Sequence, residues 1–133
     1  MKKEVAKKWV KALRSGKYKQ GDGCLKQTNL KKNKTYHCCL GVLCELYNEQ
    51  MTKSKKKKLN DVVDKHGLHF FDKDVEVLPD SVVQWSGLDG KTAHFNKIIN
   101  YDDYDYASLA AMNDLGCSFK KIANTIEKEW ENL

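Results

Sequence analysis

Residues 38–47 read Cys-Cys-Leu-Gly-Val-Leu-Cys-Glu-Leu-Tyr, a stretch that is almost entirely apolar. Leucines stand at positions 40, 43 and 46, and this interval of three residues is typical of a helix. Because a helix that is apolar all round must be covered on all sides, the stretch predicts a central buried helix.

Amphipathic helices are predicted at both ends of the chain. At the N-terminal end, Lys2–Arg14 carries apolar residues at intervals of three or four and is followed by Ser15-Gly16, a helix-ending pair. Near the C-terminal end, Ala107–Asn113 predicts a short helix, and Ser118 predicts the cap of a last one. Its apolar face comprises Phe119, Ile122, Ala123, Ile126 and Trp130. We expect a core made of Trp9, Leu40, Leu43, Leu46, Ile122 and Ile126.

The segments between these helices predict shorter elements. Lys17–His37 contains turn residues on either side of Cys24-Leu25-Lys26, which favours a short β-hairpin. Leu59–Lys65 is interpreted as a short helix, His69–Phe71 and Val75–Val77 as a second hairpin, and Pro79–Trp85 as another short helix. Thr92–Tyr106 is compatible with either a strand or an irregular loop.

Length and composition predict one α+β domain over residues 1–133. A chain of this size has room for one core, and 41% hydrophobic with 32% charged residues is typical of a globular protein. No apolar run approaches the ~20 residues that cross a membrane, and the charged start Met1-Lys2-Lys3-Glu4 does not resemble a signal peptide. We therefore expect a cytoplasmic protein with no membrane partner.

Five cysteines, three of them at positions 38, 39 and 44, fit free thiols in a reducing compartment. With His37 beside them they raise the alternative of a zinc site, but the paired C-x2-C spacing of structural zinc sites is missing. Buried small apolar side chains are the preferred interpretation, and no metal or cofactor is expected.

Charge is distributed unevenly along the chain. Residues 1–58 hold 17 Lys and Arg against 4 Asp and Glu, a net charge of +13, whereas residues 59–133 carry a net charge of −7. The two halves could attract each other, the basic half could face an anionic partner, or the lysines could form only a solvated surface. Residues 50–58, rich in lysine, are predicted to form a mobile basic loop.

Catalytic and nucleotide-binding signatures are missing from the sequence. It contains no P-loop, no GxGxxG and no carboxylate–histidine motif, so binding is expected rather than enzymatic catalysis. The two C-terminal helices resemble a helix-turn-helix, but the last helix mixes lysines with glutamates and makes a poor DNA-reading face.

Several segments together resemble a group of small uncharacterised proteins of tailed phages. The resemblance rests on residues 12–21 (ALRSGKYKQG), 36–44 (YHCCLGVLC), 78–79, 85–88 and 112–123 (MNDLGCSFKKIA). Residues 48–77 and 89–106 depart from the pattern. Some small phage proteins act as sponges that sequester nucleotide signals of bacterial immune systems such as Thoeris and CBASS. The resemblance therefore implies a phage accessory protein that acts in the host cytoplasm and sequesters a cyclic ADP-ribose-type signal or a cyclic dinucleotide.

A nucleotide ligand needs an aromatic face, cations or N–H groups for phosphate, and polar groups for ribose. Two polar segments supply these types, and we expect them to meet in one cleft. The candidate ligand-binding residues are Arg14, Lys17, Tyr18, Gln20, Asn113, Asp114 and Ser118. Each also has a structural interpretation as a cap, a turn residue or half-buried packing. A protein-binding phage factor, a basic nucleic-acid-associated protein and an unrecognised enzyme are the alternative functions, and a homo-oligomer stays open.

Overall fold

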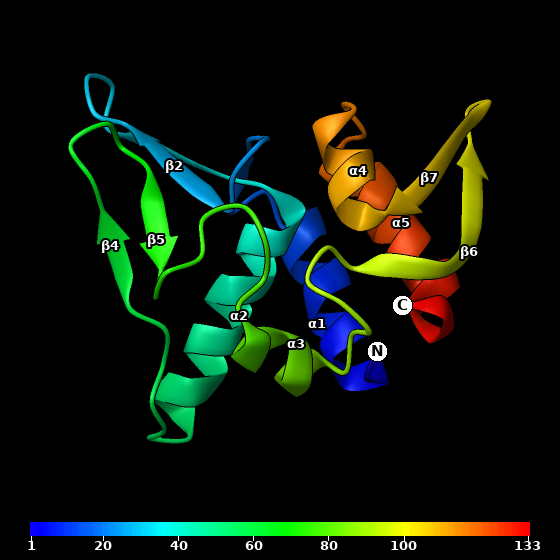
Figure 1. Ribbon diagram of the computed structural model, residues 1–133, viewed down its shortest axis with the longest axis horizontal. Coiled ribbons are helices and arrows are strands. Elements are labelled where there is room, and N and C mark those ends of the chain that lie inside the picture. The colour runs from blue at the N-terminus through cyan, green and yellow to red at the C-terminus, as the bar shows by residue number, and fades with distance from the viewer.

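Helix α2, Cys39–Lys53, starts in the middle of the molecule, as the apolar stretch predicts, and runs from there to its edge (Figure 1). The computed structural model describes all residues from 1 to 133. Residues 39–44 of the helix are all buried, and the Cys38 sulfur caps its start by accepting a hydrogen bond from the Gly41 N–H. Because this part of the helix is covered on every side, it forms the middle of the core.

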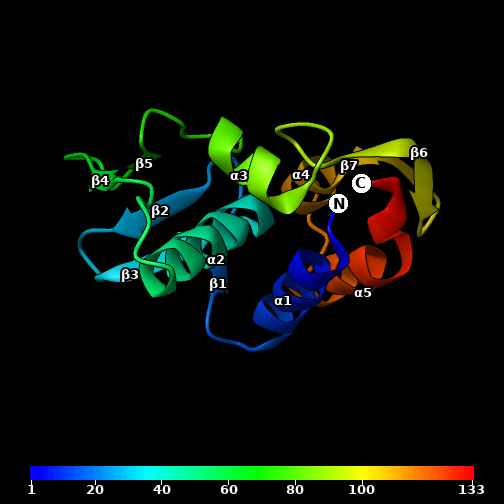
Figure 2. The same cartoon turned by 90° about the horizontal axis from the view of Figure 1, so that it is seen from below.

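Helix α1, Lys3–Arg14, lies beside α5, Phe119–Glu129, and also packs on α2 (Figure 2). Trp9 is fully buried, and its indole N–H donates a hydrogen bond of 2.9 Å to the Cys39 carbonyl, which ties α1 to α2. The predicted core is confirmed for all members except Leu46, which is only partly buried at its edge. The fully buried members are Trp9, Leu40, Leu43, Ile122 and Ile126.

Two small sheets lie side by side in the left half of Figure 1. The first has the order β1 (Lys19–Gln20), β3 (Lys34–His37) and β2 (Lys26–Asn29), with β1 parallel to β3 and the β2–β3 pair antiparallel. The second pairs β4 (Asp61–Val63) with β5 (His69–Phe71). The Thr28 N–H donates to the Gly67 carbonyl at 2.7 Å, and this bond joins the two sheets. The antiparallel β2–β3 pair confirms the first predicted hairpin.

The remaining elements complete the other half of the molecule. Helix α3, Asp80–Ser86, follows Pro79 as predicted. Strands β6 (His94–Tyr101) and β7 (Tyr104–Ser108) form an antiparallel hairpin, which settles the segment left open between strand and loop. Helix α4, Leu109–Asp114, then leads to α5 and a final 3-10 turn, Trp130–Asn132. None of the helices combines the length and apolar character needed to cross a membrane.

Three local predictions are wrong. Helix α2 continues to Lys53, because polar residues that favour helix extend it beyond its apolar part, so the basic loop begins only at residue 54. Leu59–Lys65 contains strand β4 instead of a helix, in keeping with the β-branched pair Val62-Val63. Strand β5 pairs with β4, whereas Val75–Val77 is not a strand.

The five cysteines are unpaired, and four of them are buried. Burial raises the pKa of Cys38 to about 11 and also raises those of Cys39 and Cys44 well above the ordinary range, so their reactive thiolates are scarce. Cys24 is half-buried.

We expect an alkylating reagent to modify Cys24 first in the native protein and all five cysteines only after unfolding. Mass spectrometry of peptides after timed labelling measures the order. Rapid native labelling of Cys39 would contradict its burial, and a cysteine that stays unlabelled in denaturant because it is oxidised would contradict the free thiols.

Candidate functional site

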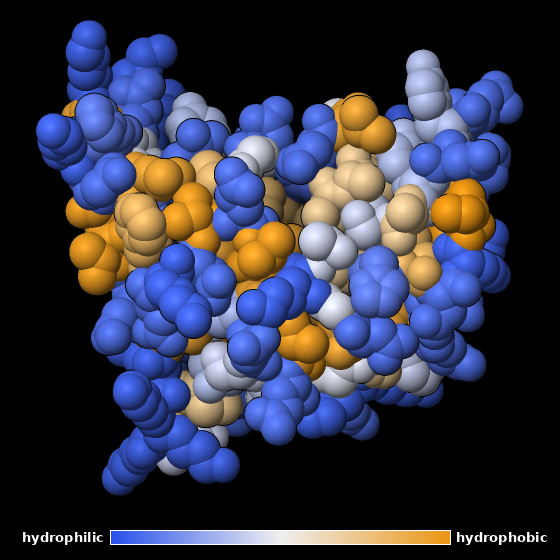
Figure 3. Space-filling view, viewed as in Figure 1, coloured by the Kyte–Doolittle hydropathy of each residue, from blue (hydrophilic) through white to orange (hydrophobic).

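A polar cleft lies between the β2–β3 hairpin and the end of α4, where the outline of the molecule dips (Figure 3). Its volume is about 890 Å³. The lining comes from three separate parts of the chain: the β1–β3 sheet with its loops, the turn before β5, and α4 with the residues that follow it. The polar and aromatic residues that line it are Gln20, Asp22, Gln27, Thr28, Asn29, Lys31, Tyr36, His66 and Asn113.

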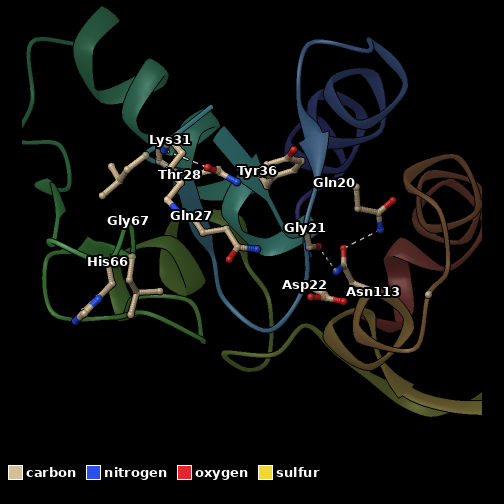
Figure 4. Close-up of a pocket in the computed structure, with 14 residues that line it drawn as sticks. Gln20, Gly21, Asp22, Gln27, Thr28, Lys31, Tyr36, His66, Gly67 and Asn113 are labelled. Atoms are coloured by element: carbon tan, nitrogen blue, oxygen red, sulfur yellow. Dashed lines mark hydrogen bonds between the residues drawn. The ribbon is translucent and has the colours of Figure 1, made fainter. Parts of the chain in front are cut away.

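One wall of the cleft is fixed by hydrogen bonds between Gln20, Gly21 and Asn113 (Figure 4). The Gln20 amide N–H donates to the Asn113 Oδ1 at 3.1 Å and to the Cys117 carbonyl at 2.8 Å, and its oxygen accepts from the Phe119 N–H at 2.9 Å. The Asn113 amide in turn donates to the Gly21 carbonyl at 2.8 Å. The polar atoms of both amides are therefore occupied by these hydrogen bonds, which hold this wall of the cleft in place.

Tyr36 and Gln27 occupy the middle of the cleft in Figure 4. They are direct partners in the β2–β3 ladder, so their side chains project from the same face of the sheet. Both are half-buried, which leaves part of the Tyr36 ring and the Gln27 amide open to the cleft. An aromatic ring beside a free amide can stack on a planar group and read its hydrogen-bonding edge.

A lysine, an aspartate and a histidine stand at the rim of the cleft. Lys31 lies in the β2–β3 turn, His66 in the turn before β5, and Asp22 in the loop after β1, and all three are exposed. No ion pair joins Lys31 to an acidic residue. The Lys31 ammonium is thus available to an anionic group of a ligand.

Arg14, a predicted ligand residue, lies elsewhere. Its guanidinium donates to Glu127 at 2.9 Å and to Asn124 at 2.8 Å, and both partners belong to α5. Arg14 thereby closes the end of the α1–α5 contact and does not line the polar cleft.

Lys17 and Tyr18 form a second separate group between α1 and α2. The Lys17 ammonium lies 5.3 Å from the centre of the Tyr18 ring, and this ring meets His37 edge-on at 5.1 Å. Burial raises the pKa of the Tyr18 hydroxyl, and the Lys17 charge opposes that rise. Tyr18 is therefore half-buried packing beside a lysine, outside the cleft.

Asp114 and Ser118 have local roles. The Asp114 carboxylate accepts a hydrogen bond of 3.1 Å from the Gly23 N–H and so anchors the loop after β1. The Ser118 hydroxyl accepts from the Lys121 N–H at 3.2 Å, which is the predicted cap of α5. Neither residue lines the polar cleft.

The seven predicted residues thus do not converge on one site. The structure brings together only Gln20 and Asn113, which are 93 positions apart in sequence. The segment between Arg14 and Gln20 leaves α1 and becomes extended at β1, so neighbouring side chains point in different directions. Gln27, Lys31, Tyr36 and His66 were missed. Side chains alternate between the two faces of the β2–β3 hairpin, so Gln27 and Tyr36 could be assigned to the cleft face only if the strand register were known.

A hydroxyl–imidazole–carboxylate chain lies on the other face of the β2–β3 hairpin. The His69 Nδ1 lies 2.6 Å from the Asp61 Oδ1, and its Nε2 lies 2.7 Å from the Thr28 hydroxyl. Thr28 follows Gln27 in the same strand, so its side chain projects from the opposite face to Gln27, although Thr28 also borders the cleft. Asp61 also binds the Lys26 ammonium, which contacts Glu45 of α2 at 3.2 Å. This network ties β2, β4, β5 and α2 together.

The comparisons with known proteins identify a family. A family model described as a domain of unknown function (DUF8296) matches residues 1–130, nearly the whole chain, and the protein belongs to this family. Neither a curated protein nor a solved structure matches the chain. No cluster of three or more histidine, cysteine or acidic side chains is placed to hold a metal ion.

Proposed function

We propose that the protein binds a nucleotide in the polar cleft between the β2–β3 hairpin and α4 and sequesters it without changing it chemically. The observation that carries this proposal is the lining: the half-open Tyr36 ring, the free Gln27 amide and the unpaired Lys31 ammonium meet in about 890 Å³. Ligand sites typically enclose about 300–1,000 Å³ and place a few polar groups around an apolar or aromatic surface.

Each part of a nucleotide has a suitable partner in the cleft. The Tyr36 ring offers a stacking surface for the base, and the Gln27 amide lies beside it for the base edge. Lys31 supplies a cation for phosphate, and Asp22 supplies an acceptor for ribose hydroxyls. Gln20 and Asn113 support the wall, so they position the site and do not read the ligand.

The resemblance of the sequence to phage proteins favours a particular class of nucleotide. A signal made by a bacterial defence system, either a cyclic ADP-ribose isomer or a cyclic dinucleotide, combines bases, ribose hydroxyls and phosphate in one compact molecule. A protein that only holds such a signal would lower its free concentration in the host.

Isothermal titration calorimetry with cyclic dinucleotides, cyclic ADP-ribose isomers and ADP-ribose tests the proposal. Lys31→Ala is expected to weaken binding about tenfold to a hundredfold, because a charge-assisted hydrogen bond typically contributes about 1.5–3 kcal/mol. Tyr36→Ala is expected to weaken it further through loss of stacking. The matched controls are Lys32→Ala in the same turn and Tyr104→Ala on β7, and neither residue lines the cleft.

Two results would contradict the proposal. The first is no binding heat with any compound of the panel. The second is chromatography showing that the ligand recovered after denaturation differs from the ligand added, which would indicate an enzyme.

A further inference from the structure

A second concave surface, the α1–α5 groove, runs along α1 beside the last turns of the chain. In Figure 2, α1 and α5 lie side by side, and this surface lies along their contact. Its volume is about 650 Å³, and it shares no residue with the polar cleft. We define the α1–α5 groove by its lining residues, which are Lys3, Ala6, Lys7, Val10, Lys11, Arg14, Ser15, Glu127 and Trp130.

The floor of the α1–α5 groove is apolar. Its base is formed by Ala6 and Val10 of α1, which are 3% and 6% exposed, and the half-buried indole of Trp130 also lines it. The methylene stems of the lysines on α1 extend this apolar surface upward, because lysine covers apolar surface with its stem while its ammonium stays in water.

The rim of the α1–α5 groove is a row of positive charge. Lys3, Lys7 and Lys11 are four residues apart on one helix, so they repeat about every 6 Å along the groove. None of the three forms an ion pair in the structure, and the Lys3 ammonium lies 6.0 Å from the centre of the Trp130 ring. The only acidic lining residue, Glu127, is held by Arg14 at 2.9 Å.

We propose that the α1–α5 groove binds an acidic amphipathic helix of a partner protein. A helix seated in a groove buries apolar side chains at intervals of three and four residues. Carboxylates four residues apart on such a helix repeat about every 6 Å, the same interval as the lysines of the rim. A nucleic acid would match the lysines through its phosphates but would leave the apolar floor uncovered, so charge and floor together favour the acidic helix.

The test uses a synthetic helical peptide with leucines at every third or fourth position and glutamates on both flanks. Fluorescence anisotropy of the labelled peptide is expected to report binding to the full chain at physiological salt. Lys7→Glu is expected to weaken this binding about tenfold or more. The matched control is Lys32→Glu, which changes the net charge equally but lies in the β2–β3 turn, and it is expected to leave binding within about twofold because distant charges are screened.

A peptide with serine in place of the leucines is expected to lose binding, since it cannot cover the floor. Equal weakening by Lys7→Glu and Lys32→Glu, or equal binding of the serine peptide, would overturn the proposal in favour of unspecific charge attraction. Binding only to DNA or to anionic lipid vesicles, and not to the leucine peptide, would also overturn it. Lys31→Ala, which changes the polar cleft, is expected to leave peptide binding unchanged. The peptide experiment therefore tests the α1–α5 groove independently of the nucleotide proposal.

Discussion

Gly41→Ala is expected to destabilise the domain by about 3 kcal/mol or more, although alanine normally favours a helix over glycine by about 1 kcal/mol. A Cβ atom at position 41 would lie 1.8 Å from the Leu25 carbonyl oxygen. Leu25 cannot easily move away, because its N–H donates to Val75 at 2.7 Å and its carbonyl accepts from Cys38 at 3.2 Å. Chemical denaturation followed by circular dichroism measures the loss.

The matched control for this substitution is Gly16→Ala. Gly16 has φ +75° and no atom near the position of an added Cβ, so alanine there brings only backbone strain of about 1–2 kcal/mol. If Gly41→Ala were as stable as the parent or more so, the close approach of α2 to Leu25 would be wrong.

Asn113→Leu is expected to lower the free energy of unfolding by about 3 kcal/mol or more. The Asn113 side chain is only 2% exposed, and its oxygen accepts from the Cys39 N–H at 3.0 Å and from Gln20 at 3.1 Å. Its amide nitrogen donates to the Gly21 carbonyl at 2.8 Å. Leucine has a similar size but leaves the Cys39 N–H without its acceptor and the Gly21 carbonyl without its donor, whereas Gln20 keeps its bond to Cys117. Each buried polar group left unsatisfied costs about 1–3 kcal/mol. The free energy of unfolding measured in urea tests the expectation.

Asn124→Leu is the control, because Asn124 is an exposed amide of α5 whose side chain accepts a single bond from Arg14. Asn124→Leu is expected to lower the free energy of unfolding by less than about 1 kcal/mol. Similar losses for Asn113→Leu and Asn124→Leu would show that the network around Asn113 does not support the wall of the cleft.

The helices could be predicted because their signal is local. Trp9 and Leu13 on one helix and Ile122 and Ile126 on another repeat at the helical interval, and the side chains that repeat this way are those the structure buries. The end of α2 and strand β4 could not be predicted in this way. The last turns of α2 are polar and half-exposed, and β4 is too short for its alternation to be distinguished from a helical pattern.

The candidate site was less accessible from sequence than the fold. Residue types suited to a nucleotide could be found, but their meeting place depends on contacts between distant segments. Gln20 reaches Asn113 only because β1 pairs with β3 and α4 packs against α2, and no spacing in the sequence encodes that contact. The sequence shows an aromatic residue at position 36, Tyr36. The face of the hairpin from which its ring projects depends on a strand register that only the structure gives.

The first part of the link between α2 and β4, residues 54–58, has a consequence for how the protein would behave after proteolysis. It is exposed, it contains four consecutive lysines, and it lies where the net charge of the chain changes sign. A trypsin-like protease would therefore find its preferred sites there and produce two fragments of opposite charge. Helix α1 of the first packs on α5 of the second, and the ion pairs of Arg14 with Glu127 and of Lys26 with Asp61 cross the cut. The nicked protein would stay together as a non-covalent pair, so two bands on a denaturing gel would not mean a lost fold.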